Sequence, residues 1–107
     1  MKKIILSAGF CAVLLFSAVI PTKADSLELC SSIGESAEKI MEARQLGISM
    51  EILMNKLPEE GPTRNLMQNV LIMAYDSPRY STEKYRSESI KDFRNLWYLE
   101  CIKTMSE

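Results

Sequence analysis

Few residues of this 107-residue sequence could carry out chemistry, because histidine is absent altogether. Without histidine there is no His-based catalytic triad, no His metal ligand and no imidazole pH switch. Serine is plentiful, yet the sequence has no Gly-x-Ser-x-Gly elbow and no glycine loop that could cradle a phosphate. A Ser–Lys dyad stays open, although no spacing favours one. We therefore expect a protein that is not an enzyme and that needs no cofactor.

Clusters of carboxylates and clusters of methionine thioethers are the two remaining groups that could carry out chemistry. Paired carboxylates perform glycosidase chemistry only in a cleft that separates their pKa values, and we interpret the glutamates as a solvated face and an acidic loop. These are Glu35, Glu38, Glu42, Glu59 and Glu60. Clustered methionines can bind Cu(I), but core filler is their usual role. They are Met41, Met50, Met54, Met67, Met73 and Met105. All except Met105 fall on apolar helical stripes, so we expect no metal site.

The first 24 residues have the pattern of a cleavable signal peptide. Lys2 and Lys3 precede an uncharged apolar stretch, and Pro21 and the small residue Ala24 follow it. The alternative is an uncleaved anchor, but the stretch is at the short end for a bilayer, which needs about 20 residues. We expect cleavage after Ala24, which leaves a single domain, residues 25–107, in the periplasm or secreted, with no membrane attachment.

The charge of the mature chain bears on its partners. The sequence carries 14 acidic and 13 basic residues, and three of the lysines lie in residues 1–24, so the mature net charge is −4. Nucleic-acid binders need clustered Lys and Arg, so we expect no nucleic acid. With 47% hydrophobic residues the chain is expected to form a packed core.

The apolar residues follow a helical period throughout, which predicts an all-α fold, a small bundle of about four helices. The first helix is expected over residues 26–46, ended by Gly47. A short second helix should span residues 49–57, with Ser49 as N-cap and Pro58 as the terminator.

The third helix is expected to begin at Pro62 or Thr63 and to end before Pro78. Its apolar face is wide enough to suggest a central helix buried on two sides. The face comprises Leu66, Met67, Val70, Leu71, Met73 and Ala74. The fourth helix should run from Ser81 or Thr82 to Met105.

Signal cleavage leaves two cysteines, Cys30 near the start of the first helix and Cys101 near the end of the last. Both lie on apolar stripes, so they come level if these two helices pack antiparallel. An exported small domain with an even cysteine count favours a disulfide, here one that joins the first and last helices. In the chain-entropy model such a loop contributes about 4 kcal/mol. An intermolecular disulfide and two free thiols are the alternatives.

Tyrosines and basic residues alternate where the third helix gives way to the fourth. Tyr and Arg are enriched at protein interfaces, so this segment is the candidate partner-binding surface, and a basic patch favours an acidic partner surface. Its residues are Arg79, Tyr80, Lys84, Tyr85 and Arg86. The alternative is structural, with these side chains covering the edge of the core.

Several short motifs follow one another along the mature chain. They are Cys30, Met41-Glu42-Ala43-Arg44-Gln45-Leu46-Gly47, Ala74-Tyr75-Asp76-Ser77-Pro78-Arg79-Tyr80, Phe93, Tyr98 and Cys101. In this order the chain resembles a family of small exported bacterial and phage-associated helical proteins without an assigned biochemical role. The resemblance implies a secreted helical domain with one disulfide, and it supplies no catalytic or binding residues. A looser likeness, in architecture alone, exists to periplasmic acid-stress chaperones.

The leading functional hypothesis is an exported, non-enzymatic binding module that acts on another protein in the periplasm, as an inhibitor, an immunity-like protein or an exclusion factor. The missing catalytic groups and the Tyr/Arg segment motivate it. The alternative is a periplasmic stress chaperone that exposes Met-rich apolar surface when loosened. An enzyme of unknown type is the third possibility.

Overall fold

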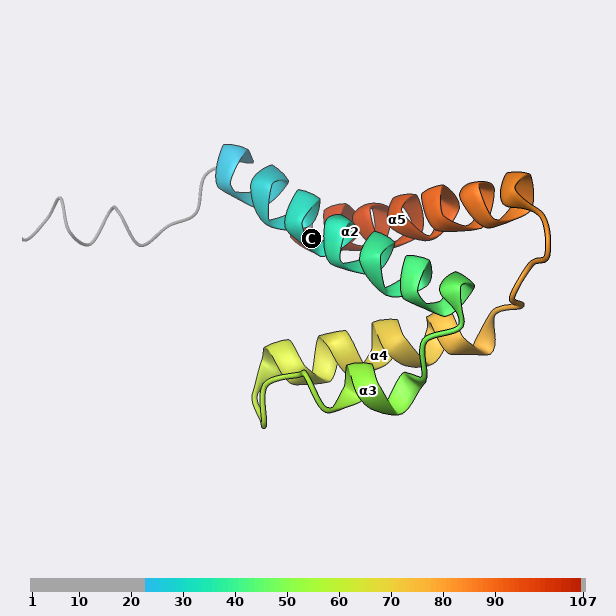
Figure 1. Cartoon of the computed structure of the whole chain (residues 1–107). Helices are drawn as coiled ribbons and strands as arrows, with labels where there is room; N and C mark the ends of the chain where they lie inside the picture. The colour runs from blue at the N-terminus through green and yellow to red at the C-terminus, as the bar shows by residue number, and fades with distance from the viewer. Residues whose placement is uncertain (1–22, 107) are drawn as a thin grey trace, which may run out of the picture.

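A computed structural model describes residues 23–106, which form four α-helices and no strand within that range (Figure 1). The helices are α2 (Lys23–Leu46), α3 (Met50–Met54), α4 (Pro62–Asp76) and α5 (Glu83–Ser106). The prediction of an all-α bundle of about four helices is confirmed. The proposed signal peptide lies outside the described residues except for Lys23 and Ala24, which form the first turn of α2.

The two long helices, α2 and α5, pack side by side and antiparallel, and this pair is the main body of the fold (Figure 1). Gly34 lies at their crossing, where a Cβ would come within 3.4 Å of the Arg94 carbonyl oxygen and 3.5 Å of Tyr98 Cβ. These are ordinary van der Waals distances, so α2 and α5 are in close contact at this crossing. Arg94 also forms an ion pair with Glu38 across this seam.

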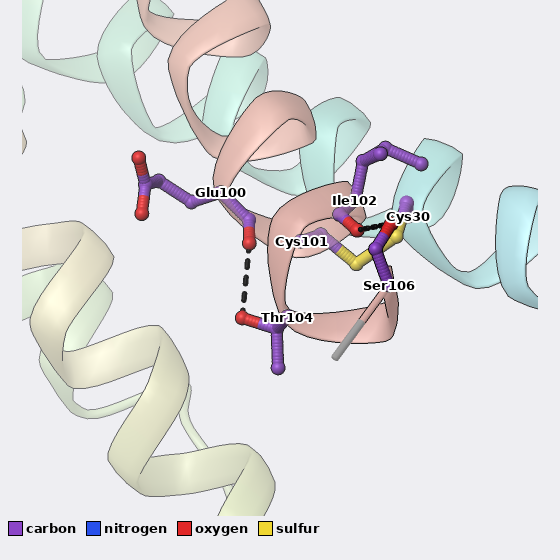
Figure 2. The surroundings of a disulfide bond; sticks show 6 residues. All are labelled: Cys30, Glu100, Cys101, Ile102, Thr104 and Ser106. Atoms are coloured by element: carbon purple, nitrogen blue, oxygen red, sulfur yellow. Dashed lines mark hydrogen bonds between the residues drawn. A yellow bond between two sulfur atoms is a disulfide. The ribbon is translucent and has the colours of Figure 1, made fainter.

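A disulfide joins Cys30 to Cys101, with a Cα–Cα distance of 5.4 Å, so the predicted staple between the first and last helices is confirmed. Figure 2 shows it in the last turns of α5, where Thr104 and Ser106 donate hydrogen bonds to the carbonyl oxygens four residues earlier. Both cysteines are buried. The antiparallel packing places them level, as their positions on the apolar stripes predict.

Helix α2 ends as its sequence predicts. Gly47 has a φ of +84°, and the N–H of Ile48 donates to the Ala43 carbonyl while that of Gly47 donates to the Arg44 carbonyl, both at 3.0 Å. This pair of bonds is the Schellman motif, which satisfies carbonyls that a helix end leaves unpaired. The chain then turns sharply into α3.

Helix α3 is shorter than the sequence suggests. Ser49 is its N-cap, accepting a hydrogen bond from the N–H of Glu51, but the helix ends at Met54 instead of reaching Leu57. The N–H of Leu57 bonds to the carbonyl of Met54, three residues back, which is a tighter turn than an α-helix. Pro58 disfavours helical geometry at Leu57, so the chain leaves the α-helix before that residue through this tighter turn.

The expectation that the third helix is central was wrong. Helix α4 packs against α2 and α3, and it is α2 that lies between α4 and α5 (Figure 1). Only one side of α4 is buried, and Met73, which the sequence pattern assigned to the core, is 44% exposed. The apolar face of α4 is wider than the surface that α2 and α3 cover.

The core is small and lies where α2, α4 and α5 meet. Its buried members are Ala37, Met41, Val70, Ala74 and Phe93. Partly buried apolar side chains from all three helices pack around them, among them Trp97, whose ring contacts that of Phe93 edge to face. Such a limited core gives the disulfide a large share in the stability of the domain.

Candidate interaction site at the loop between α4 and α5

The loop between α4 and α5, residues 77–82, is held against the C-terminal end of α2 by one buried amide. Gln45 is 2% exposed. Its Nε2 donates to the Pro78 carbonyl at 2.9 Å, and its Oε1 accepts from the N–H of Tyr80 at 2.8 Å. The same Nε2 lies 3.5 Å from the sulfur of Met41. One side chain thus pairs with the main-chain groups that flank Arg79, the carbonyl of Pro78 and the N–H of Tyr80, much as a neighbouring β-strand pairs with a backbone.

Two arginines complete this attachment from opposite directions. Arg44 on α2 donates from Nε and Nη2 to the Ser77 carbonyl, at 3.1 and 2.9 Å. Arg79 in the loop donates from Nε back to the Gln45 carbonyl at 3.1 Å. The guanidinium of Arg79 lies so close to Gly47 that a Cβ there would be 2.7 Å from Nη2. The end of α2 and the loop therefore hold each other.

Tyr75 supports the same corner from α4. Its hydroxyl donates to the Ile48 carbonyl at 2.6 Å. The Arg44 guanidinium lies over its ring, with Cζ 5.3 Å from the ring centroid. Burial raises the pKa of the Tyr75 hydroxyl, and the positive charge of Arg44 partly opposes that rise. The hydroxyl is therefore held in its protonated, donating form.

The structure divides the five predicted partner-binding residues into two groups. Arg79 is bound to the end of α2, and Arg86 donates from Nε to the Tyr80 carbonyl and from Nη2 to the Ser81 carbonyl, both at 3.0 Å. Lys84, Tyr80 and Tyr85 are exposed. The two tyrosine rings lie together, with centroids 6.1 Å apart and planes tilted by 42°.

The engagement of Arg79 and Arg86 is part of a general pattern. Every one of the five arginines in the chain donates a hydrogen bond within it, four to main-chain carbonyls and one to a carboxylate. Their guanidinium donors are used to fix loops and helix ends. The arginines bound to carbonyls keep their charge, since a carbonyl is neutral, and carboxylates still outnumber the basic side chains of residues 25–107, whose net charge is −4.

A groove of about 440 Å³ opens beside the tyrosine pair. Its walls include Tyr80 and Tyr85, and the side chains of Met41 and Phe93, which are 2% and 5% exposed, close its base. The exposed carboxylates of Glu88 and Asp92, one turn apart on α5, lie along its rim, and Leu96 ends it. The groove thus combines an apolar base, two aromatic rings and two negative charges.

A second groove, of about 360 Å³, lies at the other end of the molecule beside the disulfide. It separates the start of α4, at Pro62 and Leu66, from the end of α5, at Trp97 and Met105. Its lining is mostly apolar. The Nε1 of Trp97 is buried without a hydrogen-bond partner among the atoms of the described chain.

Three residues that build the site, Gln45, Glu88 and Asp92, were not among the site residues predicted from the sequence. Gln45 stands one turn after Met41 on the same helical face, so it occupies a core position, but an amide near a helix end is usually read as solvent-exposed. Glu88 and Asp92 follow the tyrosine-rich segment at helical spacing. A stripe through Tyr85, Glu88, Asp92 and Leu96 was available as a signal.

Between residues 23 and 106, no three acidic or cysteine side chains are grouped so that they could hold a metal ion. No helix in that range has the length and apolar character needed to cross a bilayer.

Comparison with known proteins gives no match to a protein-family model, a curated protein or a solved structure. The resemblance to small exported helical proteins therefore stays a prediction from the sequence.

Proposed function

We propose that this chain is an exported, non-enzymatic binding module that recognises another protein in the periplasm or outside the cell, acting as an inhibitor, an immunity-like protein or an exclusion factor. One observation carries the proposal. The buried amide of Gln45 fixes the loop of residues 77–82, and this fixed loop presents the exposed ring of Tyr80 beside that of Tyr85, in the first turn of α5.

A fixed loop with exposed tyrosines has the properties of a recognition surface. Tyr offers a large contact area and a hydroxyl while having few rotatable bonds. Because the backbone is already ordered by Gln45, Arg44 and Arg79, little conformational entropy is lost when a partner binds. We assign the contact to Tyr80 and Tyr85, place Lys84 as an exposed charge beside them, and assign the support of the loop to Arg79 and Arg86.

The disulfide and the N-terminal sequence together support the proposed exported location. A buried disulfide that links the ends of a small domain suits an oxidising environment, and residues 1–24 have the pattern of a secretory signal. The mature chain is expected to begin at Asp25. N-terminal sequencing or the intact mass of the protein from a cell-envelope extract tests this, and a product that retains residues 1–24 would overturn it.

Catalysis and nucleic-acid binding are both disfavoured by the same site. Acid–base catalysis by two carboxylates needs environments that separate their pKa values, whereas Glu88 and Asp92 are both exposed to solvent. A nucleic-acid surface needs free arginines and lysines in a cluster, whereas Arg79 and Arg86 are bound to main-chain carbonyls. Protein recognition needs neither.

Site-specific photo-cross-linking tests the proposal. The full chain is expressed with benzoylphenylalanine in place of Tyr85, and in a control in place of Glu59, which is exposed on the loop between α3 and α4. The expected result is one discrete adduct from position 85 and none from position 59. The same adducts from both positions, or none from position 85 at native expression, would overturn it.

A chaperone is the second candidate, and the groove beside the disulfide favours it. Apolar side chains line that groove, and Leu29 and Met105 there are 48% and 44% exposed. Reduction of the Cys30–Cys101 bond would let α2 and α5 separate at this end. Suppression of client aggregation at low pH, measured with and without reductant, tests this role; a chaperone should act on many unrelated clients.

A further inference from the structure

We infer that the groove lined by Tyr80, Tyr85 and the following turns of α5 binds a lysine or arginine side chain from a basic segment of the partner protein. This inference rests on the proposed function and names the chemistry of its partner. It reverses the expectation, drawn from the basic and aromatic composition of residues 79–86, that the partner surface is acidic.

The shape of the groove suits a long side chain with a charged end. Above the buried Met41 and Phe93, the exposed side chains of Tyr80, Tyr85 and Leu96 give the groove an apolar surface of the kind that the methylene stem of lysine or arginine covers. The carboxylates of Glu88 and Asp92 at the rim are placed to meet the charged head. A wholly apolar side chain would displace water from these carboxylates and offer no hydrogen bond or opposite charge in its place.

The charges at the rim are unpaired in the free protein. Within residues 23–106 the ion pairs are Arg94–Glu38 and Lys103–Glu100, so neither Glu88 nor Asp92 takes part in one. The two stand four residues apart on α5, and like charges at that spacing destabilise a helix. A cation bound between them would remove that repulsion and form charge-assisted hydrogen bonds with both.

The tyrosines add a second attraction for the same head group. A cation within about 6 Å of a tyrosine ring centroid is attracted by the ring face. Tyr80 and Tyr85 line the same groove as Glu88 and Asp92, with their rings tilted by 42° to each other. An anionic side chain would meet two carboxylates and the negative faces of two rings.

The basic residues of the loop do not reverse this preference. Arg79 and Arg86 keep their positive charges, but hydrogen bonds to main-chain carbonyls fix their guanidinium groups, and neither residue lines the groove. Lys84 stands one turn before Glu88 on α5 without an ion pair to it in the described structure. It is the cation best placed to compete for the rim, so the variant Lys84→Gln should bind a basic ligand more tightly.

The test uses the folded mature protein and two blocked tetrapeptides, one rich in lysine and one with glutamate in the same positions. Binding is followed by backbone amide chemical shifts. The lysine peptide should shift the signals of Tyr85 and Ser89 and should lose affinity as salt is raised. The glutamate peptide should leave these signals unchanged. Equal binding of both peptides, or shifts located elsewhere, would overturn the inference.

Matched double variants separate the groove from general charge. Glu88→Gln with Asp92→Asn should weaken the lysine peptide by at least about tenfold, the equivalent of losing one charge-assisted contact. Glu59→Gln with Glu60→Gln removes the same charge from the exposed loop after α3 and should change affinity by less than about twofold, a screening effect only. Equal weakening by the two double variants would contradict a specific site.

The same variants distinguish failure of this inference from failure of the proposed function. If the Tyr85 photo-adduct forms in the Glu88→Gln/Asp92→Asn background as well as in the parent chain, the binding module stands and the basic partner is wrong. If the lysine peptide binds as expected but position 85 gives no adduct, the groove chemistry stands and recognition of a partner protein is wrong.

Discussion

The side-chain oxygen of Gln45 accepts a hydrogen bond from the backbone N–H of Tyr80 at 2.8 Å, across 35 positions of sequence. Because the other end of the same amide donates to the Pro78 carbonyl, a single buried side chain sets the backbone on both sides of Arg79. The exposed tyrosines are therefore positioned from inside the core.

The first prediction concerns this amide. Gln45→Ala leaves the part-buried N–H of Tyr80 and the part-buried carbonyl of Pro78 without their partner, and a fully buried group of this kind costs about 1–3 kcal/mol. We expect the free energy of unfolding, measured by urea denaturation, to fall by about 2–4 kcal/mol, since part of the loop can rehydrate. Gln68→Ala on α4 is the control and should change it by less than about 0.5 kcal/mol. Equal effects of the two substitutions would contradict the role of Gln45.

The second prediction concerns the disulfide. Replacement of Cys30 and Cys101 by alanine should lower the free energy of unfolding by roughly 2–5 kcal/mol, the range for small exported domains. Reductant should destabilise the parent chain by a similar amount and leave the double variant unaffected. Labelling of both thiols in folded, unreduced protein would show that the bond does not form in solution.

The third prediction concerns alkaline pH. Burial raises the pKa of Tyr75 above the ordinary tyrosine value of 10.0, so the folded state retains the proton at a pH where the unfolded state loses it. The stabilisation is fully present below about pH 10 and is lost as the pH rises through the raised pKa. The melting temperature of the parent chain should therefore fall more steeply above pH 10 than that of Tyr75→Phe. Tyr98→Phe, which removes another phenol from α5, should behave as the parent does.

The fourth prediction concerns Trp97. Its Nε1 is buried without an acceptor, and such a donor costs about 1–3 kcal/mol. Trp97→Phe removes that donor, which stabilises the fold, but it also loses part of the packed ring, which destabilises it. Because these two effects oppose each other, the free energy of unfolding should change by less than about 1 kcal/mol. Trp97→Ala should cost about 3–5 kcal/mol. A phenylalanine variant as unstable as the alanine variant would mean that the Nε1 has a partner in solution.

The sequence is a good guide to the local structure of this protein. Ser49, Gly47 and Pro62 mark helix boundaries because caps and stops depend on the backbone preferences of single residues. The partnership of Cys30 and Cys101 follows from two stripe positions and an antiparallel packing. In each case the physical cause acts within one helix or between two.

The candidate site depends on contacts that no such pattern records. Arg79 and Arg86 have the composition of a binding patch, but their acceptors are main-chain carbonyls, which every residue type supplies equally. The position of α4 is similarly hidden, because its wide apolar face does not reveal that α2 and α3 are its main neighbours. Met73 is exposed for that reason.

The disulfide also changes what a protease can do to this molecule. Cys30 and Cys101 are 71 positions apart, so the bond closes most of the domain into a covalent ring. One cut in the exposed loop of residues 59–61 opens that ring without releasing a fragment, and the two pieces remain tethered while their helices stay packed. A second cut is needed before either piece can diffuse away. A nicked copy would therefore keep both its grooves and its tyrosine pair.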